Sequence, residues 1–562
     1  MKLEYILIGA AIAVGIVLLA VWDRRREKNR LLSLVRERWG KPGSVDPQEI
    51  RLRTINAYLE SLPKRRNDVD GVTWNDLDLD RVFTELNTTF SAVGEEYLYA
   101  LLHRPETEAG PLAEFEERVR FFSERERCRE ELAVSFARMG KLRAISLYGY
   151  LSRIADVRPE SNLRHFALLL GYAAGLLCFP FGYGMWGVWI VLTAALCNIL
   201  SYYQRKGEIE PYLLVFSYLL RWLQEVERLE KTDAAKEPPI AEDGKELRAA
   251  ARVFSGFRRG ASLLTPASPT GSLLDMIMDY VRMLFHVDLI KFNSMYRFFL
   301  GHQKELDRLF FLTGRLDAAL AVASYRQYKQ TWCEPVLRAE GAVTLRTSEM
   351  YHPLIAEPVK NSIDAKRPVL LTGSNASGKS TFLKMVALNA VFAQTIHTVL
   401  ADSYESRYMH VLSSMALRDD LELGESYYIV EIKSLKRILD AADGTLPVLC
   451  FVDEVLRGTN TAERIAASSR ILADLAGRKA LPFAATHDLE LTDILASYYD
   501  NYHFSEQIVG QDVVFDYRLR RGKAVSRNAI RLLAMLSYPE HIIRESEKTV
   551  ERFLITGDWE KL

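Results

Sequence analysis

Apolar positions along this chain follow two different spacings, and each spacing predicts a different kind of element. Between residues 29 and 328, apolar side chains recur mostly at helical intervals among charged residues, which predicts a long helical region. From residue 331 onward, short apolar runs alternate with helical stretches, and the run Val369–Thr372 is typical of a buried parallel strand. The pattern therefore predicts an α/β domain that follows an α-helical core.

The first uninterrupted apolar stretch, Tyr5–Trp22, predicts a membrane anchor. A helix needs about 20 apolar residues to cross a bilayer, and this run just qualifies. The basic cluster Arg24–Arg26 comes after the run, whereas a signal peptide carries its positive charge before the apolar core. We therefore expect an uncleaved transmembrane anchor at residues 1–22, followed by a helical linker at 23–70 in the cytoplasm.

A second apolar stretch runs from Phe166 to Tyr203 and is interrupted by the turn signal Pro180–Gly184. Basic residues flank it on both sides, with Arg164 before it and Arg205 after it. These flanks favour a transmembrane hairpin, at residues 161–204, that returns the chain to the cytoplasm. Each half has only about 15 to 20 residues, so a re-entrant hairpin and a buried pair of soluble helices remain alternatives.

Composition adds two constraints. The chain has 562 residues, enough for several domains, and 73 basic residues balance 73 acidic ones. A nucleic-acid partner is therefore not indicated by overall charge, and any basic surface must be local. The five cysteines form no CxxC pair and no zinc-type spacing, which favours free thiols in a reducing compartment.

A glycine-rich segment after the run Val369–Thr372 predicts a nucleotide site, because it matches the phosphate-binding pattern G-x-x-x-x-G-K-[ST]. In such a loop, backbone N–H groups and the N-terminus of the following helix face the phosphates. Lys379 would contact the outer phosphates, and Ser380 would be a ligand of Mg²⁺. The nucleotide-binding residues are Gly373, Ser374, Asn375, Ala376, Ser377, Gly378, Lys379, Ser380 and Thr381.

Two further strand ends carry candidate catalytic residues. The apolar run 448–452 ends in Asp453 and Glu454, as in a Walker B strand. Asp453 would hold the metal, and Glu454 would activate the attacking water. A third predicted strand, residues 481–486, ends at His487, which would sense the γ-phosphate or position the water. ATP and Mg²⁺ are therefore the predicted ligands.

Several separate stretches resemble the MutS family. The P-loop with its preceding threonine is similar to that family's TGPNMGGKST, the segment 453–461 to DEIGRGTST, and 485–492 to ATHYHELT. Residues 419–428 resemble a segment whose serine acts across the dimer on the partner's nucleotide, and here that serine is Ser426. Weaker likeness includes 351–354, Asn361, 316–323 and 86–105. The resemblance therefore covers roughly residues 70–160 and 205–562.

The resemblance implies a homodimer with composite ATP sites and, by the family alone, DNA as a partner in mismatch repair or a related transaction. The sequence also departs from the family pattern at three points. The segment before Gly71 is too short for the family's mismatch-reading domain, Ala376 replaces a family methionine, and Tyr427–Tyr428 replaces a Thr-Phe pair.

Together these features predict a MutS/ABC-type α/β P-loop ATPase domain after an α-helical core with transmembrane helices. We place the core at 71–160 and 205–330, the second part with a lever, and the ATPase domain at 331–562. The predicted function is a membrane-anchored, multi-pass ATPase with its ATPase domain in the cytoplasm, coupling ATP hydrolysis to conformational change. The alternatives are a membrane ATPase that acts on a protein partner without DNA and, less favoured because no LSGGQ signature is present, an ABC-type transporter subunit.

Overall fold

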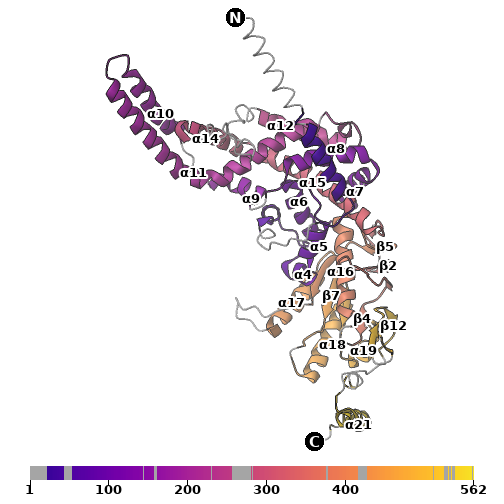
Figure 1. The fold of residues 1–562 in the computed structure, drawn as a ribbon. Coiled ribbons are helices and arrows are strands. Elements are labelled where there is room, and N and C mark those ends of the chain that lie inside the picture. Colours follow the sequence, from indigo (N-terminus) through magenta and orange to yellow (C-terminus); the bar gives the residue numbers. More distant parts are fainter. Residues whose placement is uncertain are drawn as a thin grey trace. The chain divides into compact units, whose positions relative to one another are not determined.

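A computed structural model of the chain defines its fold (Figure 1). It describes residues 22–23, 25–43, 54–142, 145–156, 161–229, 231–255, 280–281, 283–374, 377–415, 427–457, 459–509, 512–524, 530, 533, 538–557, 559 and 561. The predicted anchor Tyr5–Trp22 therefore lies outside the described residues except for Trp22. The chain forms two compact units, one of residues 1–63, 86–100 and 115–328 and the other of 64–85, 101–114 and 329–562.

The first unit, called the helical unit below, is organised around α15 (Gln303–Lys329), whose side chains are buried along most of its length. The N-terminal part of α6 (Ala92–His103) packs on it. There, the Asp317 carboxylate of α15 accepts hydrogen bonds from the backbone N–H groups of Phe90 and Ser91 at 3.2 and 2.8 Å, ahead of α6. Gly94 is required at this crossing, because a Cβ atom there would lie 2.2 Å from an Asp317 oxygen.

The other helices of this unit surround α15 or extend from it. They are α3 (Ala57–Ser61), α7 (Ala109–Glu124, shared between the units), α8 (Glu126–Met139), α9 (Leu147–Ser152), α10 (Asn162–Leu177), α11 (Gly184–Leu229), α12 (Ile240–Val253) and α14 (Val287–Leu300), with 3₁₀ turns η1 (Arg153–Asp156) and η2 (Ala234–Lys236).

Helices α10 and α11 form a hairpin that extends from the rest of the helical unit (Figure 1). The predicted break at Pro180–Gly184 is confirmed, because α10 ends at Leu177 and α11 begins at Gly184. Among the described residues, Gly184–Gly207 is the one helical segment long and apolar enough to cross a membrane, by length and composition alone. Only 11% of its most apolar window is buried, so a buried pair of soluble helices is the wrong description of this hairpin.

The second unit, called the ATPase unit below, contains a six-stranded sheet in the order β12-β9-β4-β8-β7-β6. All neighbouring strands are parallel except β12, which is antiparallel to β9. Every residue of β4 and β8 is buried, as expected for central strands of a covered parallel sheet. The strands are β4 (Val369–Thr372), β6 (His410–Ser414), β7 (Val448–Asp453), β8 (Ala480–Ala485), β9 (Asp500–His503) and β12 (Arg520–Arg521).

Smaller sheets and helices complete the ATPase unit. A four-stranded sheet has the order β1-β5-β2-β3, and β10 pairs with β11 as a hairpin. These strands are β1 (Val336–Arg338), β2 (Leu345–Met350), β3 (Asn361–Ala365), β5 (Ser403–Arg407), β10 (Glu506–Val509) and β11 (Asp512–Phe515). The helices are α4 (Gly71–Asp76), α5 (Leu79–Leu86, which ends at the unit boundary), α16 (Lys379–Thr395), α17 (Tyr427–Ala442), α18 (Thr461–Gly477), α19 (Glu490–Ile494) and α21 (Glu540–Thr556).

Residues 64–85 and 101–114 belong to the ATPase unit, although we expected residues 71–160 to form one part of the helical core. The reason is a set of polar contacts between α4 and the end of β6. The Asp76 carboxylate accepts hydrogen bonds from the Ser413 hydroxyl at 2.7 Å and from the Met415 backbone N–H at 2.9 Å. These contacts join segments about 340 residues apart, which no local sequence pattern indicates.

Candidate nucleotide site

The P-loop occupies the position that the sequence predicts. It follows β4, the third strand of the six-stranded sheet, and leads into α16, which begins at Lys379. Gly373 and Gly378 have φ angles of 148° and 105°, so the loop needs glycine at both positions. Asn375 and Ala376 lie outside the described residues. The N-terminus of α16 thus stands at the carboxyl edge of the sheet, where its N–H groups and dipole favour an anion.

The Lys379 ammonium group is buried and is held by the loop itself. It donates hydrogen bonds to the carbonyl oxygens of Gly373 at 2.8 Å and Ser374 at 2.9 Å. Both acceptors are neutral carbonyl groups. A nearby hydroxyl, Ser377 Oγ, is buried and has no hydrogen-bond partner among the described residues.

Ser380 and Asp453 form the predicted metal pair. Their separation in sequence is 73 residues, yet the Ser380 hydroxyl donates a hydrogen bond to Asp453 Oδ2 at 2.5 Å. The other carboxylate oxygen, Oδ1, is buried and lacks a partner among the described residues. Burial raises the pKa of Asp453, and the hydrogen bond from Ser380 opposes that effect. A hard cation with oxygen ligands fits this pair, because it would satisfy Oδ1 and favour the ionised carboxylate.

Glu454 lies immediately beyond β7, in a loop with unusual backbone geometry. Its φ angle is 52°, and that of Leu456 is 58°; both lie in the left-handed region that side chains rarely adopt. The Glu454 carboxylate is contacted from both sides, by His487 Nε2 at 2.9 Å and by Arg457 Nε at 2.9 Å. These two contacts fix the direction of a carboxylate that is still 20% exposed and therefore accessible to water.

The tautomer of His487 follows from its neighbours. Its Nε2 atom lies 2.9 Å from Glu454 Oε1 and 3.4 Å from Lys379 Nζ. A protonated lysine can only donate, so a hydrogen bond from Lys379 would require a lone pair on His487 Nε2. A hydrogen bond to the Glu454 carboxylate instead requires a proton on Nε2. The shorter contact assigns the proton to Nε2. His487 therefore donates through Nε2 to Glu454 and does not accept a hydrogen bond from Lys379 at this atom.

Two supporting residues were not anticipated from the sequence. Glu431 of α17 is buried and accepts a hydrogen bond from the backbone N–H of Leu456, in the loop that carries Glu454. Burial raises its pKa, and the backbone hydrogen bonds from Leu456 and Arg457 oppose this. The only signal in the sequence is an isolated acid in the apolar run Ile429–Ile432, which is weak evidence by itself.

The second supporting residue is Arg464 of α18. Its guanidinium group makes two hydrogen bonds to the Asp488 carboxylate, at 2.9 and 2.6 Å, directly after His487. A bidentate pair of this kind restricts both partners. It ties α18 to the loop that carries the histidine. The pairing spans 24 residues and depends on the packing of β7, α18 and β8.

A cavity of about 470 Å³ extends from the P-loop and provides room beyond the phosphates. Its walls include Phe382, Phe504 and Tyr517, together with the family-like residues His352 and Asn361. The Asn361 side chain donates to the Tyr517 carbonyl at 3.0 Å and accepts from the Leu519 N–H at 2.7 Å, so it holds one wall in place. Burial lowers the pKa of His352 to about 4, so its ring is neutral at physiological pH.

The predicted trans residue, Ser426, lies outside the described residues, and so does the segment 416–425 before it. Its contact with a partner's nucleotide stays a prediction. Five predicted site residues that the structure describes converge on one edge of the sheet. Lys379 and Ser380 lie at the start of α16, which follows β4, Asp453 and Glu454 lie at the end of β7, and His487 lies beyond the end of β8.

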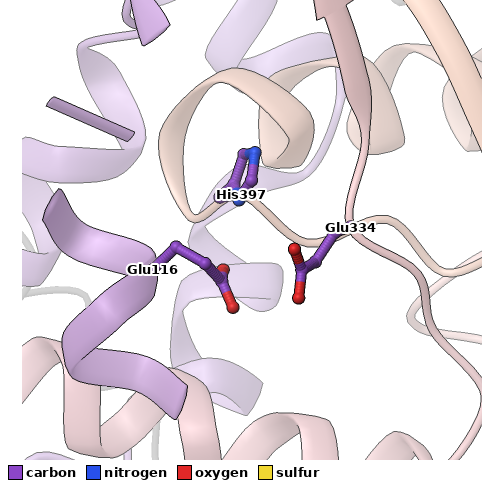
Figure 2. Close-up of side chains that lie close together, drawn as sticks. All are labelled: Glu116, Glu334 and His397. Carbon is purple, nitrogen blue, oxygen red and sulfur yellow. The ribbon is translucent and has the colours of Figure 1, made fainter. Parts of the chain in front are cut away.

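Figure 2 labels the side chains of Glu116, Glu334 and His397, which are residue types that can bind metals. Glu116 belongs to the helical unit, whereas Glu334 and His397 belong to the ATPase unit. Within the helical unit, Glu116 is buried and accepts two hydrogen bonds from Arg326, at 2.8 and 2.6 Å. We therefore assign Glu116 to a structural ion pair and propose no metal site there.

Comparison with known proteins identifies the same part of the chain. Residues 369–554 match the family described as MutS domain V. The chain is 33% identical over 247 residues to the DNA mismatch repair protein MutS of Natronomonas pharaonis, covering 42% of this chain and 28% of that protein.

Two further relatives give the same result. DNA mismatch repair protein MutS 2 of Haloarcula marismortui is 32% identical over 262 residues, which covers 41% of this chain and 27% of that protein. MutS protein homolog 4 of Mus musculus is 30% identical over 228 residues, with 37% and 24% covered. The match therefore spans only about a quarter of the length of each of these relatives.

Proposed function

The chain belongs to the MutS family, and from this premise we propose that it hydrolyses ATP with Mg²⁺ and couples the nucleotide cycle to conformational change. The observation that carries the proposal is the convergence of the Ser380–Asp453 pair and the Glu454–His487 pair on the P-loop edge of one sheet. A phosphate-binding loop, a cation site and a water-activating carboxylate are the parts that ATP hydrolysis needs.

Each side chain has a distinct role in this proposal. Lys379 and the N–H groups at the start of α16 bind the phosphates, while Ser380 and Asp453 hold Mg²⁺. The metal, when bound, neutralises charge on the phosphates. Glu454 accepts a proton from the attacking water, and His487 and Arg457 hold its carboxylate in position. The cavity lined by Phe382, Phe504 and Tyr517 receives the nucleoside.

Glu454→Gln is the test of this assignment in the purified full chain. The amide keeps the shape of the side chain but accepts a proton poorly, so we expect turnover to fall by about 10²- to 10⁴-fold with ATP binding retained. Lys379→Ala should instead weaken ATP binding itself. Binding of a fluorescent ATP analogue and phosphate release separate the two effects. Unchanged phosphate release in the Glu454→Gln protein would contradict the assignment.

We propose further that the active unit is a homodimer in which Ser426 of one chain completes the partner's site. The support is the likeness of residues 419–428 to the family segment. Mixing a Lys379→Ala chain with a Ser426→Ala chain tests it. In the mixed dimer both defects fall on one composite site, and the other site is intact. Recovered activity would support the proposal, and no recovery in verified mixed dimers would mean that Ser426 does not act in trans.

DNA is the proposed partner on the ground of the family alone, since relatives carry the name DNA mismatch repair protein. The alternative is an ATPase that acts on a protein partner at a membrane. A binding assay with homoduplex, mismatched and branched DNA at several salt concentrations separates the two. Contacts to phosphates make affinity fall steeply with salt, and no binding at about 50 mM salt would favour the alternative.

We also propose that the protein is attached to a membrane with its ATPase unit in the cytoplasm. The support is the apolar run Tyr5–Trp22 before Arg24–Arg26 and the exposed apolar surface of the α10–α11 hairpin. Alkaline carbonate extraction of membranes that contain the full chain provides the measurement. Retention in the membrane pellet is expected, and release into the supernatant would contradict the attachment.

A further inference from the structure

The α10–α11 hairpin is built with its small residues inside and its large apolar residues outside. A Cβ atom on Gly175 would lie 3.0 Å from the Gly187 carbonyl oxygen and 2.7 Å from Val191, so the two helices pack with their backbones close together. Large side chains point away from this contact and are more than half exposed: Leu163, Phe166, Leu170, Leu176, Leu177, Met185, Trp186, Trp189, Leu192, Leu196, Leu200 and Tyr203. A helix pair in water shows the opposite arrangement.

The chemistry of the hairpin indicates which environment covers this surface. No Asp, Glu, Lys or Arg occurs between Arg164 and Arg205, a stretch of 40 residues. Several of its polar side chains have partners within the protein. Thr193 donates to the Trp189 carbonyl at 2.8 Å, and Asn198 donates to the Ala194 carbonyl at 2.8 Å and to the Leu168 carbonyl of α10 at 3.5 Å. At the base, a ring nitrogen of His165 lies 2.9 Å from one of His286. Charges return only at the base, with Arg164, Arg205 and Lys206. Acyl chains around the helices and anionic headgroups at the base fit this distribution.

The first part of α11 has a length close to the thickness of a bilayer, and α10 has 16 residues. At 1.5 Å per residue, α11 rises about 27 Å from Gly184 to Tyr202. The Tyr202 hydroxyl donates to the Asp288 carboxylate at 2.8 Å, so the polar base of the hairpin begins at this level. The hydrocarbon core of a bilayer is about 30 Å thick. The difference of a few ångström can be absorbed by local thinning.

The turn at the tip decides between a hairpin that crosses and one that stops inside the hydrocarbon. Among the described residues, no backbone N–H donates to the carbonyls of Pro180, Phe181 or Gly182. Carbonyl groups without donors are costly in hydrocarbon, far more than a few ångström of mismatch. The tip also carries Tyr183 and Trp186, both more than 60% exposed, and these residue types favour the interface between headgroups and water.

We propose that α10 and the first part of α11 cross the bilayer as a helical hairpin, with the turn Phe179–Gly184 in the opposite headgroup region. This inference rests on the proposed membrane attachment and adds where the tip lies. It replaces the re-entrant alternative, because only the far interface supplies water to the three carbonyls and the aromatic residues. The apolar outer face is then covered by lipid and not by a second protein surface.

Single cysteines at the two ends of the hairpin test the proposal in the full chain. Phe181 lies at the tip and is 73% exposed, and Gln204 is exposed at the base. Phe181→Cys and Gln204→Cys are placed in a chain whose Cys178 and Cys197 are replaced by alanine. Spheroplasts of an expression host are treated with a membrane-impermeant maleimide, before and after the membrane is permeabilised. The parent chain without the added cysteine gives the background.

We expect the Phe181→Cys thiol to react from outside in intact spheroplasts and the Gln204→Cys thiol to react only after permeabilisation. If the chain stays in the carbonate pellet but the Phe181→Cys thiol reacts only in detergent, the tip lies in hydrocarbon or against protein, and the crossing is refuted. If the tip thiol reacts only from the cytoplasmic side, the hairpin does not insert. If the chain leaves the pellet, the attachment itself is wrong. The carbonate result thus separates failure of the attachment from failure of the crossing.

Discussion

The strands of the nucleotide site and the α10–α11 hairpin are both rich in large apolar residues, yet their surroundings are opposite. In β4 and β8 every residue is buried, and beyond these strands Ser380 contacts Asp453 and His487 contacts Glu454, each from another part of the chain. In the hairpin the large side chains are exposed, and Thr193 and Asn198 donate to carbonyl groups of their own helix. Apolar composition alone therefore does not separate a protein core from an exposed apolar surface.

The two regions differ in how many precisely placed contacts each one needs. The nucleotide site needs exact positions for a few charged atoms, so its loops are supported by buried side chains such as Glu431 and by the Arg464–Asp488 pair. The hairpin needs only a continuous apolar exterior and a close internal contact at Gly175 and Gly187. We expect substitutions to change the free energy of unfolding strongly in the first region and weakly in the second.

Truncation of one leucine in each region should give the largest contrast. Leu371 of β4 is fully buried, and Leu192 of α11 is 55% exposed. Leu371→Ala should lower the free energy of unfolding by about 2–5 kcal/mol, because it leaves a cavity. Leu192→Ala should change it by less than about 0.5 kcal/mol. Urea unfolding of the detergent-solubilised full chain, followed by circular dichroism, measures both. Equal effects would mean that the hairpin surface is packed against protein.

The buried carboxylate of Asp317 lies in the helical unit and accepts backbone hydrogen bonds, so its ionisation bears on stability. Burial raises the pKa of Asp317 from 3.8 to about 6, against hydrogen bonds from Ser91 and Phe90. A raised folded-state pKa means that the stabilisation is fully present below pH 3.8 and is lost as pH rises through about 6. The loss should be on the order of 3 kcal/mol.

Unfolding free energies between pH about 4 and 7 check this expectation. The free energy of unfolding should fall more steeply with rising pH in the wild-type chain than in Asp317→Asn, because the amide does not titrate in this range. An identical pH dependence in the wild-type and Asp317→Asn proteins would contradict the assignment.

The smallest effect is expected at Glu431, which acts through the loop that carries Glu454. Glu431→Ala removes the acceptor for the Leu456 N–H, so we expect kcat to fall about tenfold, equivalent to about 1.4 kcal/mol. KM for ATP should hardly change, because the phosphate and metal ligands remain. Glu431→Gln keeps one acceptor and should recover part of the loss. A parallel rise in KM, or no rescue by glutamine, would point to general unfolding instead of positioning.

Much of the nucleotide site could be predicted because its signals are local. The run Val369–Thr372, the two glycines and the start of α16 are neighbours in sequence, and the structure confirms each of these elements. The break at Pro180–Gly184 was predictable for the same reason, since proline and glycine act on their own backbone. In contrast, the placement of residues 64–85 with the ATPase unit depends on Asp76 contacts to residues 413 and 415, which leave no local trace.

The sequence by itself determined which residues could bind a phosphate, a cation and a water, because backbone conformation and side-chain chemistry are local properties. It also determined that residues 165–204 lack charge. Only the tertiary structure decided that Glu431 contacts the loop after β7 and that Arg464 contacts the loop after β8, because these contacts join elements from separate parts of the chain. Only the tertiary structure, likewise, showed the hairpin's large side chains exposed, because burial depends on what packs against a helix and not on the helix's own composition.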